Sequence, residues 1–567
     1  MSTRYPARTV ISLNGIWGFR LIEKETLEEA SPDSYAYDDV MAVPAAFDAT
    51  PRYHVKRGLA LYRRVFHLEQ ACPNALLRIG SCGFRGRYWI DGREIGASDM
   101  PYNAYEFETG PLNAGDHVVT AACDNRFDPE RMVFFKPYYD FYGYGGLYRE
   151  VRFETLPDGI ALNRLQVRTR DIETGRVELR VLFRNNWTGR VAARFAFDTD
   201  SEPRSVDLDV KDGAAVFECD VPAHRVWSLE SPELHKVRLD IDGDSIVETF
   251  GIRTFEAADG KLWLNGKPII LRGFNRHESH PECGPATNEP VMLEDLHHLK
   301  ELHCNFIRGA HYPQDPRFLD LCDSMGFLVW EEGLAWGNTA EDCANPVFAD
   351  GQVAQMRRMV RKSVNHPCVV LWGFLNEFDS TSDAGVALCK RLVDALHEED
   401  WSRPVTWACN RGLKDRCAPL VDVVSYNTYP GWIALNTDQE PEDEIRPDRD
   451  ALVAHFRKAA PGKPILVSEM GVCALYGQHD PDAAQWTEEY EARYLDTAIR
   501  AVFECPALSG IAIWHLADAM TYHRTGSVAR VKPIAQNLAG SYDAYRRAKL
   551  SARLVAGLFA EDEKKRG

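Results

Sequence analysis

The chain has 567 residues, of which 45% are hydrophobic and 26% are charged, a composition typical of a globular protein with roughly two to four domains. Its formal net charge of −18 argues against a general affinity for nucleic acid or for an anionic membrane, because both partners require a basic face. Residues 1–10 lack a signal-peptide core, and no segment approaches the roughly 18 apolar residues of a membrane span. We therefore expect a cytoplasmic protein.

Fourteen cysteines are scattered from Cys72 to Cys505 without a C-x-x-C pair or a paired histidine spacing. This pattern predicts free, mostly buried thiols rather than disulfides. The chain also lacks the G-x-S-x-G elbow, the Walker phosphate loop and the H-E-x-x-H zinc motif. We accordingly expect neither a metal nor an organic cofactor.

The first 255 residues alternate between apolar and polar positions in short runs separated by Gly, Pro, Asn and Asp. Examples are residues 61–66, 76–79, 87–90 and 117–120 in the first block, and 165–168, 176–180, 192–195 and 236–239 in the second. Such runs are typical of β-sandwiches, and the second block of about 100 residues fits an immunoglobulin-like sandwich. We predict one sandwich in residues 1–154 and the other in 155–255.

After residue 255, predicted strands alternate with predicted helices. The strands are 269–272, 305–308, 327–330, 369–372, 405–408, 421–425, 465–468 and 511–514, and the helices are 293–303, 316–325, 352–365, 385–399, 451–459, 486–503 and 542–558. Eight strands with interleaved helices favour a (β/α)8 TIM barrel over an open sheet, and we assign residues 256–567 to it.

Polar residues follow the predicted barrel strands at the ends where such barrels carry their chemistry. The fourth strand leads into Asn376-Glu377, and the seventh leads into Glu469. Taken alone, Glu377 is as easily explained as a helix cap. As a pair, Glu377 and Glu469 are the two carboxyls that glycoside hydrolysis requires, one to protonate the leaving oxygen and one to attack the sugar or activate water.

Three long motifs resemble the family 2 glycoside hydrolases, and length and layout resemble the β-glucuronidase and β-galactosidase type within that family. The motifs are Asn305-Phe-Ile-Arg-Gly-Ala-His-Tyr-Pro313 with the segment 318–332 that follows, the segment from His366 to Glu377, and Lys463-Pro-Ile-Leu-Val-Ser-Glu-Met-Gly471. The resemblance covers almost the whole chain and implies a sugar-binding-type jelly roll, an immunoglobulin-like sandwich and a catalytic barrel.

The resemblance also implies roles for particular residues. Glu377 would be the general acid/base, Glu469 the nucleophile of a retaining double displacement, and Asn376 the partner of the sugar 2-hydroxyl. Further sugar contacts would come from Asp140, His311, Tyr429 and Trp514. From the residues alone, Tyr429 and Trp514 are equally explained as core aromatics, and Asp140 as a turn cap.

One departure from the family pattern concerns the sugar. Glucuronidases carry an Asn-x-Lys-Gly segment whose lysine binds the uronate, and the corresponding stretch here is Asn537-Leu-Ala-Gly540, with Ala539 in place of the lysine. Loss of a buried charged partner costs roughly 2–5 kcal/mol. Arg530 and Lys532 lie in the preceding loop and would restore that charge, which keeps a galacturonide in range; without them the pocket suits a neutral β-galactoside.

The sequence thus predicts a retaining exo-β-glycosidase for a terminal β-linked hexose or hexuronic acid, with a β-galactoside or β-galacturonide favoured over a β-glucuronide. A β-glucuronidase with a substitute carboxylate-binding loop is the first alternative. A non-catalytic carbohydrate-binding protein and a transglycosylase are the others. The expected partner is a small glycoside or oligosaccharide, with no nucleic acid and no membrane, and the sequence leaves a homo-oligomer open.

Overall fold

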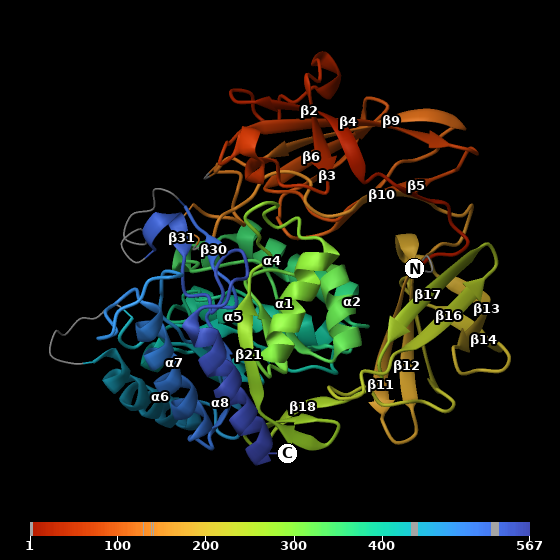
Figure 1. Ribbon diagram of the computed structural model, residues 1–567. Helices are drawn as coiled ribbons and strands as arrows, with labels where there is room; N and C mark the ends of the chain where they lie inside the picture. The colour runs from red at the N-terminus through yellow and green to blue at the C-terminus, as the bar shows by residue number, and fades with distance from the viewer. Residues whose placement is uncertain are drawn as a thin grey trace.

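The computed structural model describes residues 4–128, 130–137, 139, 141–432, 440–522 and 532–566. Two β-sandwiches and a parallel barrel follow one another along the chain (Figure 1). This arrangement confirms the predicted fold class, with sheet-rich N-terminal domains and a C-terminal barrel.

The first sandwich consists of a four-stranded and a six-stranded antiparallel sheet. The smaller sheet has the order β1 (Val10–Ser12), β10 (Val151–Thr155), β5 (Ala75–Ile79), β8 (Tyr105–Glu108); the larger has the order β3 (Asp39–Val43), β2 (Gly15–Ile22), β4 (Leu59–Leu68), β9 (Gly115–Asp124), β6 (Arg85–Ile90), β7 (Arg93–Ser98). Alternate residues of β2 and β4 point inward, so that Trp17, Phe19 and Tyr62 form a buried aromatic cluster.

The second sandwich has a three-stranded and a four-stranded antiparallel sheet. Their orders are β11 (Leu162–Asp171), β12 (Arg176–Phe183), β15 (Ala214–Asp220) and β14 (Arg204–Val210), β13 (Gly189–Phe197), β16 (His235–Ile241), β17 (Asp244–Phe250). The N-terminal segment also packs here, because Tyr5 joins this core and the buried Arg8 pairs with Asp244 at 2.6 Å.

The barrel sheet is parallel, and its ring has the order β25 (Val405–Thr406), β24 (Val369–Gly373), β23 (Leu328–Glu332), β22 (Phe306–Gly309), β21 (Leu271–Arg276), β29 (Leu508–Ile513), β28 (Ile465–Glu469), β27 (Val424–Asn427), β26 (Ala408–Cys409). Two of these segments, β25 and β26, are successive pieces of one strand interrupted at Trp407, so the ring closes there. Every residue of β22, β23 and β24 is buried, as continuous apolar runs in a parallel sheet predict.

Helices surround the barrel at α1 (Glu289–Glu301), α2 (Pro316–Met325), α3 (Ala340–Ala344), α4 (Pro346–Ser363), α5 (Asp383–Glu399), α6 (Ile445–Ala459), α7 (Glu488–Phe503) and α8 (Leu550–Arg566). Both ends of α2 match the prediction because residues next to each end determine where the helix begins and ends. Asp315 caps the N-terminus by accepting from the amide of Arg317, proline occupies the first turn, and Gly326 ends the helix at φ 70°.

Two predicted elements were wrong. The first barrel strand is 271–276 rather than 269–272. Asn265 and Gly266, both at positive φ, form a tight turn, and β20 (Lys267–Ile269) therefore pairs with β19 (Lys261–Leu264) in a hairpin instead of joining the barrel. The last helix begins at Leu550 rather than at residue 542. Residues 541–549 instead form a polar turn, in which Arg546 adopts φ 63° and bonds Asp295 at 2.9 Å.

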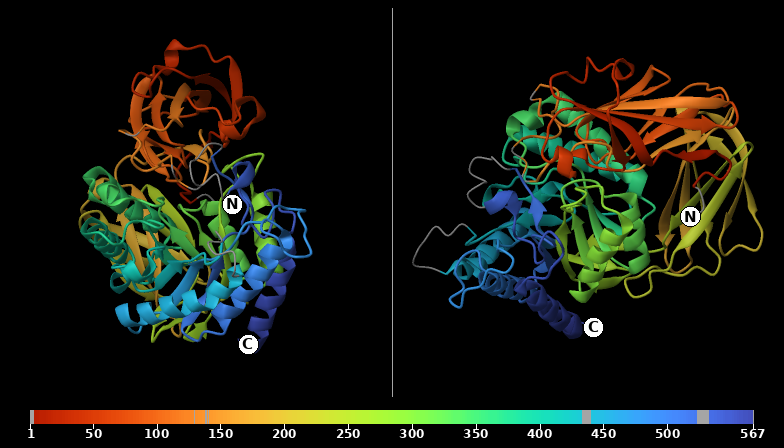
Figure 2. Two further views of the ribbon diagram at one scale, coloured as in Figure 1. Left: turned by 90° about the vertical axis from the view of Figure 1, so that its left-hand side faces the viewer. Right: turned by 45° about the horizontal axis from the view of Figure 1, so that its top comes forward.

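The two sandwiches contact opposite ends of the barrel. The first sandwich meets the loops that follow the strands: Arg149 donates to Glu278 at 2.7 Å, and Tyr102 stacks on Tyr312 with centroids 3.6 Å apart. The second sandwich meets the starts of the strands, where Arg253 donates to the carbonyl of Val369 at 2.5 Å. In the views of Figure 2 the first sandwich lies across the barrel and the second lies beside it.

All fourteen cysteines are free, and eleven of them are buried, as predicted. None of the helices among the described residues has both the length and the apolar character needed to cross a bilayer.

Candidate active site

Glu377 and Glu469 both lie at the carboxyl ends of barrel strands. Glu469 is the last residue of β28 and is 3% exposed. Glu377 follows β24 by four residues and adopts the left-handed region at φ 56°, with its amide donating to the carbonyl of Ala408 at 2.9 Å. A non-glycine residue held at positive φ carries backbone strain, which proteins concentrate at functional sites.

The two oxygens of the Glu469 carboxylate are each held by a different side chain. Arg308 Nη1 donates to Oε1 at 2.5 Å, and the Tyr429 hydroxyl donates to Oε2 at 2.5 Å. Short, charge-assisted bonds of this kind favour the ionised carboxylate and fix its orientation. Glu469 is therefore held at both carboxylate oxygens in one orientation.

Arg308 connects several of the residues around Glu377 and Glu469. It is fully buried in β22, and its guanidinium pairs with Glu332 of β23 through bonds of 2.9 and 3.0 Å. It also donates to the side-chain oxygens of Asn275 at 2.9 Å and of Asn376 at 2.8 Å. One cation thereby fixes groups from four strands or strand ends in a single arrangement.

The side-chain carboxyl of Glu377 has no cationic partner at hydrogen-bond distance among the described residues, although Arg411 donates to the backbone carbonyl of Glu377 at 3.3 Å. Its Oε1 accepts from Asn427 Nδ2 at 2.9 Å, and Asn427 accepts in turn from Ser468 Oγ at 2.7 Å. Burial, and then the negative charge of Glu469, raise the pKa of Glu377 to about 7. The pair therefore consists of one carboxylate held by two donors and one carboxyl whose pKa is raised toward neutral pH.

Asn376 offers one unused hydrogen-bond donor beside this pair, and the ring of His311 lies nearby. Asn376 is fully buried, and its Nδ2 has no hydrogen-bond partner among the described residues. His311 accepts from Arg308 at 3.2 Å through Nδ1 and stacks on Trp514 with centroids 5.1 Å apart. Burial, and then the charge of Arg308, lower the pKa of His311 to about 3, so its imidazole is neutral.

The rim near β29 brings together Trp514, Lys532 and Asn537. With its amide oriented to suit its neighbours, Asn537 accepts from Lys532 Nζ at 3.2 Å and from Trp514 Nε1 at 3.0 Å. Lys532 is 4% exposed, and burial lowers its pKa to about 7. Ala539 is buried behind this group, where its carbonyl accepts from the amide of His515.

The structure thus brings seven of the predicted residues, together with Lys532, around one set of strand ends. The seven are Glu377, Glu469, Asn376, His311, Tyr429, Trp514 and Asn537. Asp140 and Arg530 lie outside the described residues, although Phe141, next to Asp140, contacts the His311 ring at 5.9 Å. Sequence reasoning did not assign Arg308 or Asn427 a role in the site. A charged residue inside a buried strand, as Arg308 is, was the available signal.

A separate cluster of ligand-type side chains, Asp323, His366 and Cys368, lies near the start of β24, at the end away from Glu377. Hydrogen bonding accounts for it: Asp323 accepts from the amide of Cys368 at 2.9 Å and pairs with His366 at 2.6 Å. We therefore interpret these three residues as a structural group that fixes the start of β24.

A parallel barrel with two carboxyls at its strand ends, lined by histidine, asparagine and aromatic groups, is the arrangement that glycoside hydrolysis requires. Residues 255–530 match the family model described as "Glycosyl hydrolases family 2, TIM barrel domain". The β-glucuronidase of Streptococcus agalactiae is 26% identical over 560 residues, covering 91% of each chain. That of Rattus norvegicus is 27% identical over 574 residues, covering 91% of this chain and 86% of the relative.

Solved structures agree with these matches. A GH2 β-galacturonidase from Eisenbergiella tayi bound to galacturonate has a TM-score of 0.88 and 28% identity, covering 99% of this chain and 98% of that chain. Residues 255–530 therefore carry the TIM barrel domain of family 2 of the glycoside hydrolases, and the chain as a whole is similar to a GH2 enzyme of the same architecture.

Proposed function

We propose that the protein is a retaining exo-β-glycosidase that removes a terminal β-linked hexuronic acid, with galacturonides preferred over glucuronides. The observation that carries the proposal is the unequal treatment of the two carboxyls. Glu469 is bound by Arg308 and Tyr429, whereas Glu377 has a pKa raised to about 7. The first suits a nucleophile and the second suits a proton donor.

In the first step, Glu469 attacks the anomeric carbon while Glu377 gives its proton to the leaving oxygen. The C–O bond to the aglycone breaks as the bond to Glu469 forms, and the aglycone leaves as an alcohol. Because the Glu469 charge contributes to the raised pKa of Glu377, converting Glu469 to an ester removes that contribution. The pKa of Glu377 then falls, as a residue that must next act as a base requires.

In the second step, ionised Glu377 takes a proton from water, the water oxygen attacks the anomeric carbon, and Glu469 leaves as a carboxylate. Two inversions leave the sugar with its original β configuration. Asn376 would donate its unused amide N–H to the sugar 2-hydroxyl, and neutral His311, stacked on Trp514, would line the ring. Such contacts help most when they strengthen in the transition state.

Lys532 supports an acidic sugar. An ammonium group buried beside Asn537 and Trp514 is a suitable partner for a uronate carboxylate, and it supplies the charge that Ala539 cannot. The relative from Eisenbergiella tayi is a β-galacturonidase, which is why we rank galacturonide first. Asp140 and Arg530 remain proposed substrate contacts on the resemblance alone. The free thiols support a proposed cytoplasmic location.

A neutral β-galactoside is the second candidate. Ala539, in place of the uronate-binding lysine, favours it, and so does the low pKa of Lys532, because an uncharged amine binds hydroxyl groups without a charge partner. A purely carbohydrate-binding role and transglycosylation use the same pocket and are separated from hydrolysis by product analysis.

The test is a panel of aryl β-glycosides carrying galacturonic acid, glucuronic acid, galactose, glucose or mannose, with the anomer of the first product followed by NMR. We expect the highest kcat/KM on the galacturonide and a β-configured first product. Cleavage of the glucuronide alone would contradict the preference. An α-configured first product would contradict the double displacement, and no turnover on any substrate would leave only the binding role.

A further inference from the structure

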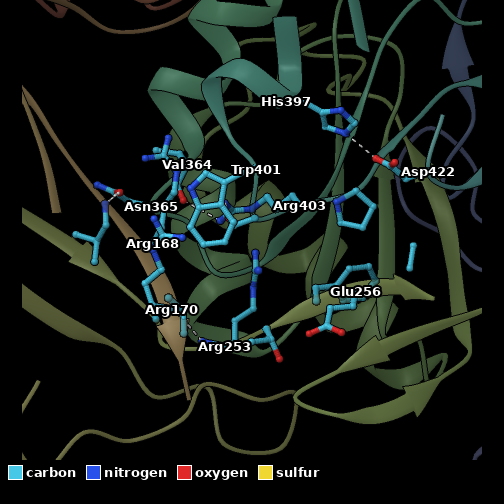
Figure 3. Close-up of a pocket in the computed structure, with 18 of the residues that line it drawn as sticks. Arg168, Arg170, Arg253, Glu256, Val364, Asn365, His397, Trp401, Arg403 and Asp422 are labelled. Carbon is cyan, nitrogen blue, oxygen red and sulfur yellow. Dashed lines mark hydrogen bonds and ion pairs between the residues drawn. The ribbon is translucent and has the colours of Figure 1, made fainter. Parts of the chain in front are cut away.

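A second cavity lies at the opposite end of the barrel from Glu377. Its volume is about 480 Å³, and it is lined by the second sandwich at β11, by the connecting segment between residues 251 and 258, by His397 of α5 and by residues 401–404 after that helix (Figure 3). Strand β24 begins at this cavity and ends toward the candidate active site. The two sites therefore share a strand but no lining residue described above.

Arg253 is the residue that needs explanation here. It is 5% exposed, and its side chain extends toward the Trp401 indole (Figure 3). Its Nε donates to the carbonyl of Pro367 at 3.0 Å and its Nη2 to that of Val369 at 2.5 Å. Its Nη1 makes no hydrogen bond, and no carboxylate lies within ion-pair distance of the guanidinium, among the described residues.

The buried carboxylate of Asp400, in the same region, already has other hydrogen-bond partners. Asp400 is fully buried and accepts from Arg403 at 2.7 Å and from Arg168 at 3.3 Å, as well as from Trp372 at 3.0 Å. Asp400 thus has two guanidinium partners, and neither of them is Arg253. Burial, and then the charge of Arg403, lower the pKa of Arg253 to about 9.

Another part of the cavity lining, at Trp401, could stack against a ring of a bound ligand. Trp401 is 49% exposed, and the Arg170 guanidinium stacks on its indole at 4.1 Å from the ring centre. Exposed tryptophan beside arginine offers an apolar face next to a charged fork, and the guanidinium fork matches the geometry of carboxylate or phosphate oxygens. Glu256 and Asp422 also line the cavity, and Asp422 pairs with His397 at 2.8 Å, so an anion would bind on the side that Arg253 and Trp401 form.

We propose that this cavity is a second binding site, for a small anion whose carboxylate or phosphate group pairs with Arg253 and whose remainder contacts Trp401. The site does not depend on the glycosidase proposal. Its ligand chemistry has two sources, an acidic sugar such as the expected product or a phosphate, and the experiment separates them.

Hydrogen–deuterium exchange on the full chain tests this directly, with galacturonate, inorganic phosphate or neutral galactose as the added probe. Using the Lys532→Met variant as well as the wild type separates this cavity from the candidate active site. We expect an anion to slow exchange in residues 251–258 and 397–404 of both proteins, and galactose to have no effect there. Protection by phosphate alone identifies a phosphate ligand, and protection by galacturonate identifies an acidic sugar.

Two substitutions locate the contact. Arg253→Gln should weaken the anion at least about tenfold, because it removes a charged hydrogen-bond donor, while Arg238→Gln, at an exposed arginine paired with Asp240, should leave it unchanged. Trp401→Ala, at a half-exposed position that does not threaten folding, should weaken galacturonate more than phosphate. The proposal is overturned if neither anion protects these segments in the wild type, or if both folded variants bind as the wild type does.

Discussion

Arg308 and Lys532 are both buried cations of the candidate active site, yet their surroundings differ. Arg308 is held by Glu332, Glu469 and two asparagine oxygens, and these carboxylates raise its pKa although burial opposes them. Lys532 sits beside the amide of Asn537, and burial lowers its pKa to about 7. At the floor of the site, formed by Arg308 and its partners, the carboxylates of Glu332 and Glu469 balance the charge of Arg308. The rim holds a cation whose charge a bound carboxylate would stabilise.

From this contrast we propose that the floor carries the chemistry and that the rim selects the sugar. Changes at the floor should lower the rate on every substrate alike. Changes at the rim should lower it only for acidic sugars. Substitutions at the floor and at the rim test this division.

Replacing Glu377 with alanine should slow glycosides with poor leaving groups by about 10²–10⁴-fold, because only these need a proton donor. Activated aryl glycosides should lose far less in the first step. The measurement is kcat/KM over a series of leaving groups, with Glu301→Gln, an exposed glutamate on α1, as the matched control. Equal losses across the series would remove Glu377 from the acid role.

Arg308→Lys should lower kcat about a hundredfold on acidic and neutral sugars alike, because an ammonium cannot bridge Glu332 and Glu469 as the guanidinium fork does. Breaking a fully buried pair also destabilises the fold, by roughly 3–5 kcal/mol. Both effects can be measured, as kcat on folded protein and as the free energy of unfolding in urea. A loss confined to uronides would contradict the division.

Lys532→Met should lower kcat/KM for a galacturonide about thirtyfold, corresponding to about 2 kcal/mol for one lost charge partner. The matching galactoside should be unaffected or improved. In the wild type, KM for the uronide should rise as pH increases through about 7, where Lys532 loses its proton, while KM for the galactoside should not. Equal losses on both sugars would mean that Lys532 has only a structural role.

Asn427→Ala should have the smallest effect. Asn427 donates to Glu377 and thereby lowers its pKa, so removing the bond should raise the pKa of Glu377. The wild type should lose activity as pH rises through about 7, because Glu377 must be protonated to act as the acid. In the variant this limb should move to higher pH, and an unmoved limb would show that another group controls it.

The fold and the two carboxyls were predictable because they follow from periodicity. Apolar runs identified the strands, and a carboxylate just beyond a buried strand has few structural explanations. The role of Arg308 was not predictable in the same way, because pattern reasoning treats a residue within a strand as packing, whereas the upper layer of a barrel interior faces the site. The partners of Lys532 and Asn427 depend on loops that only the folded chain brings together.

The most direct test of the central claim is to trap the intermediate with an activated 2-deoxy-2-fluoro galacturonide and to map the adduct by mass spectrometry. Our account predicts one sugar per chain, attached to the peptide that carries Glu469, and no adduct in Glu469→Gln. An adduct on any other residue, or rapid turnover with an inverted product and no adduct, would contradict it.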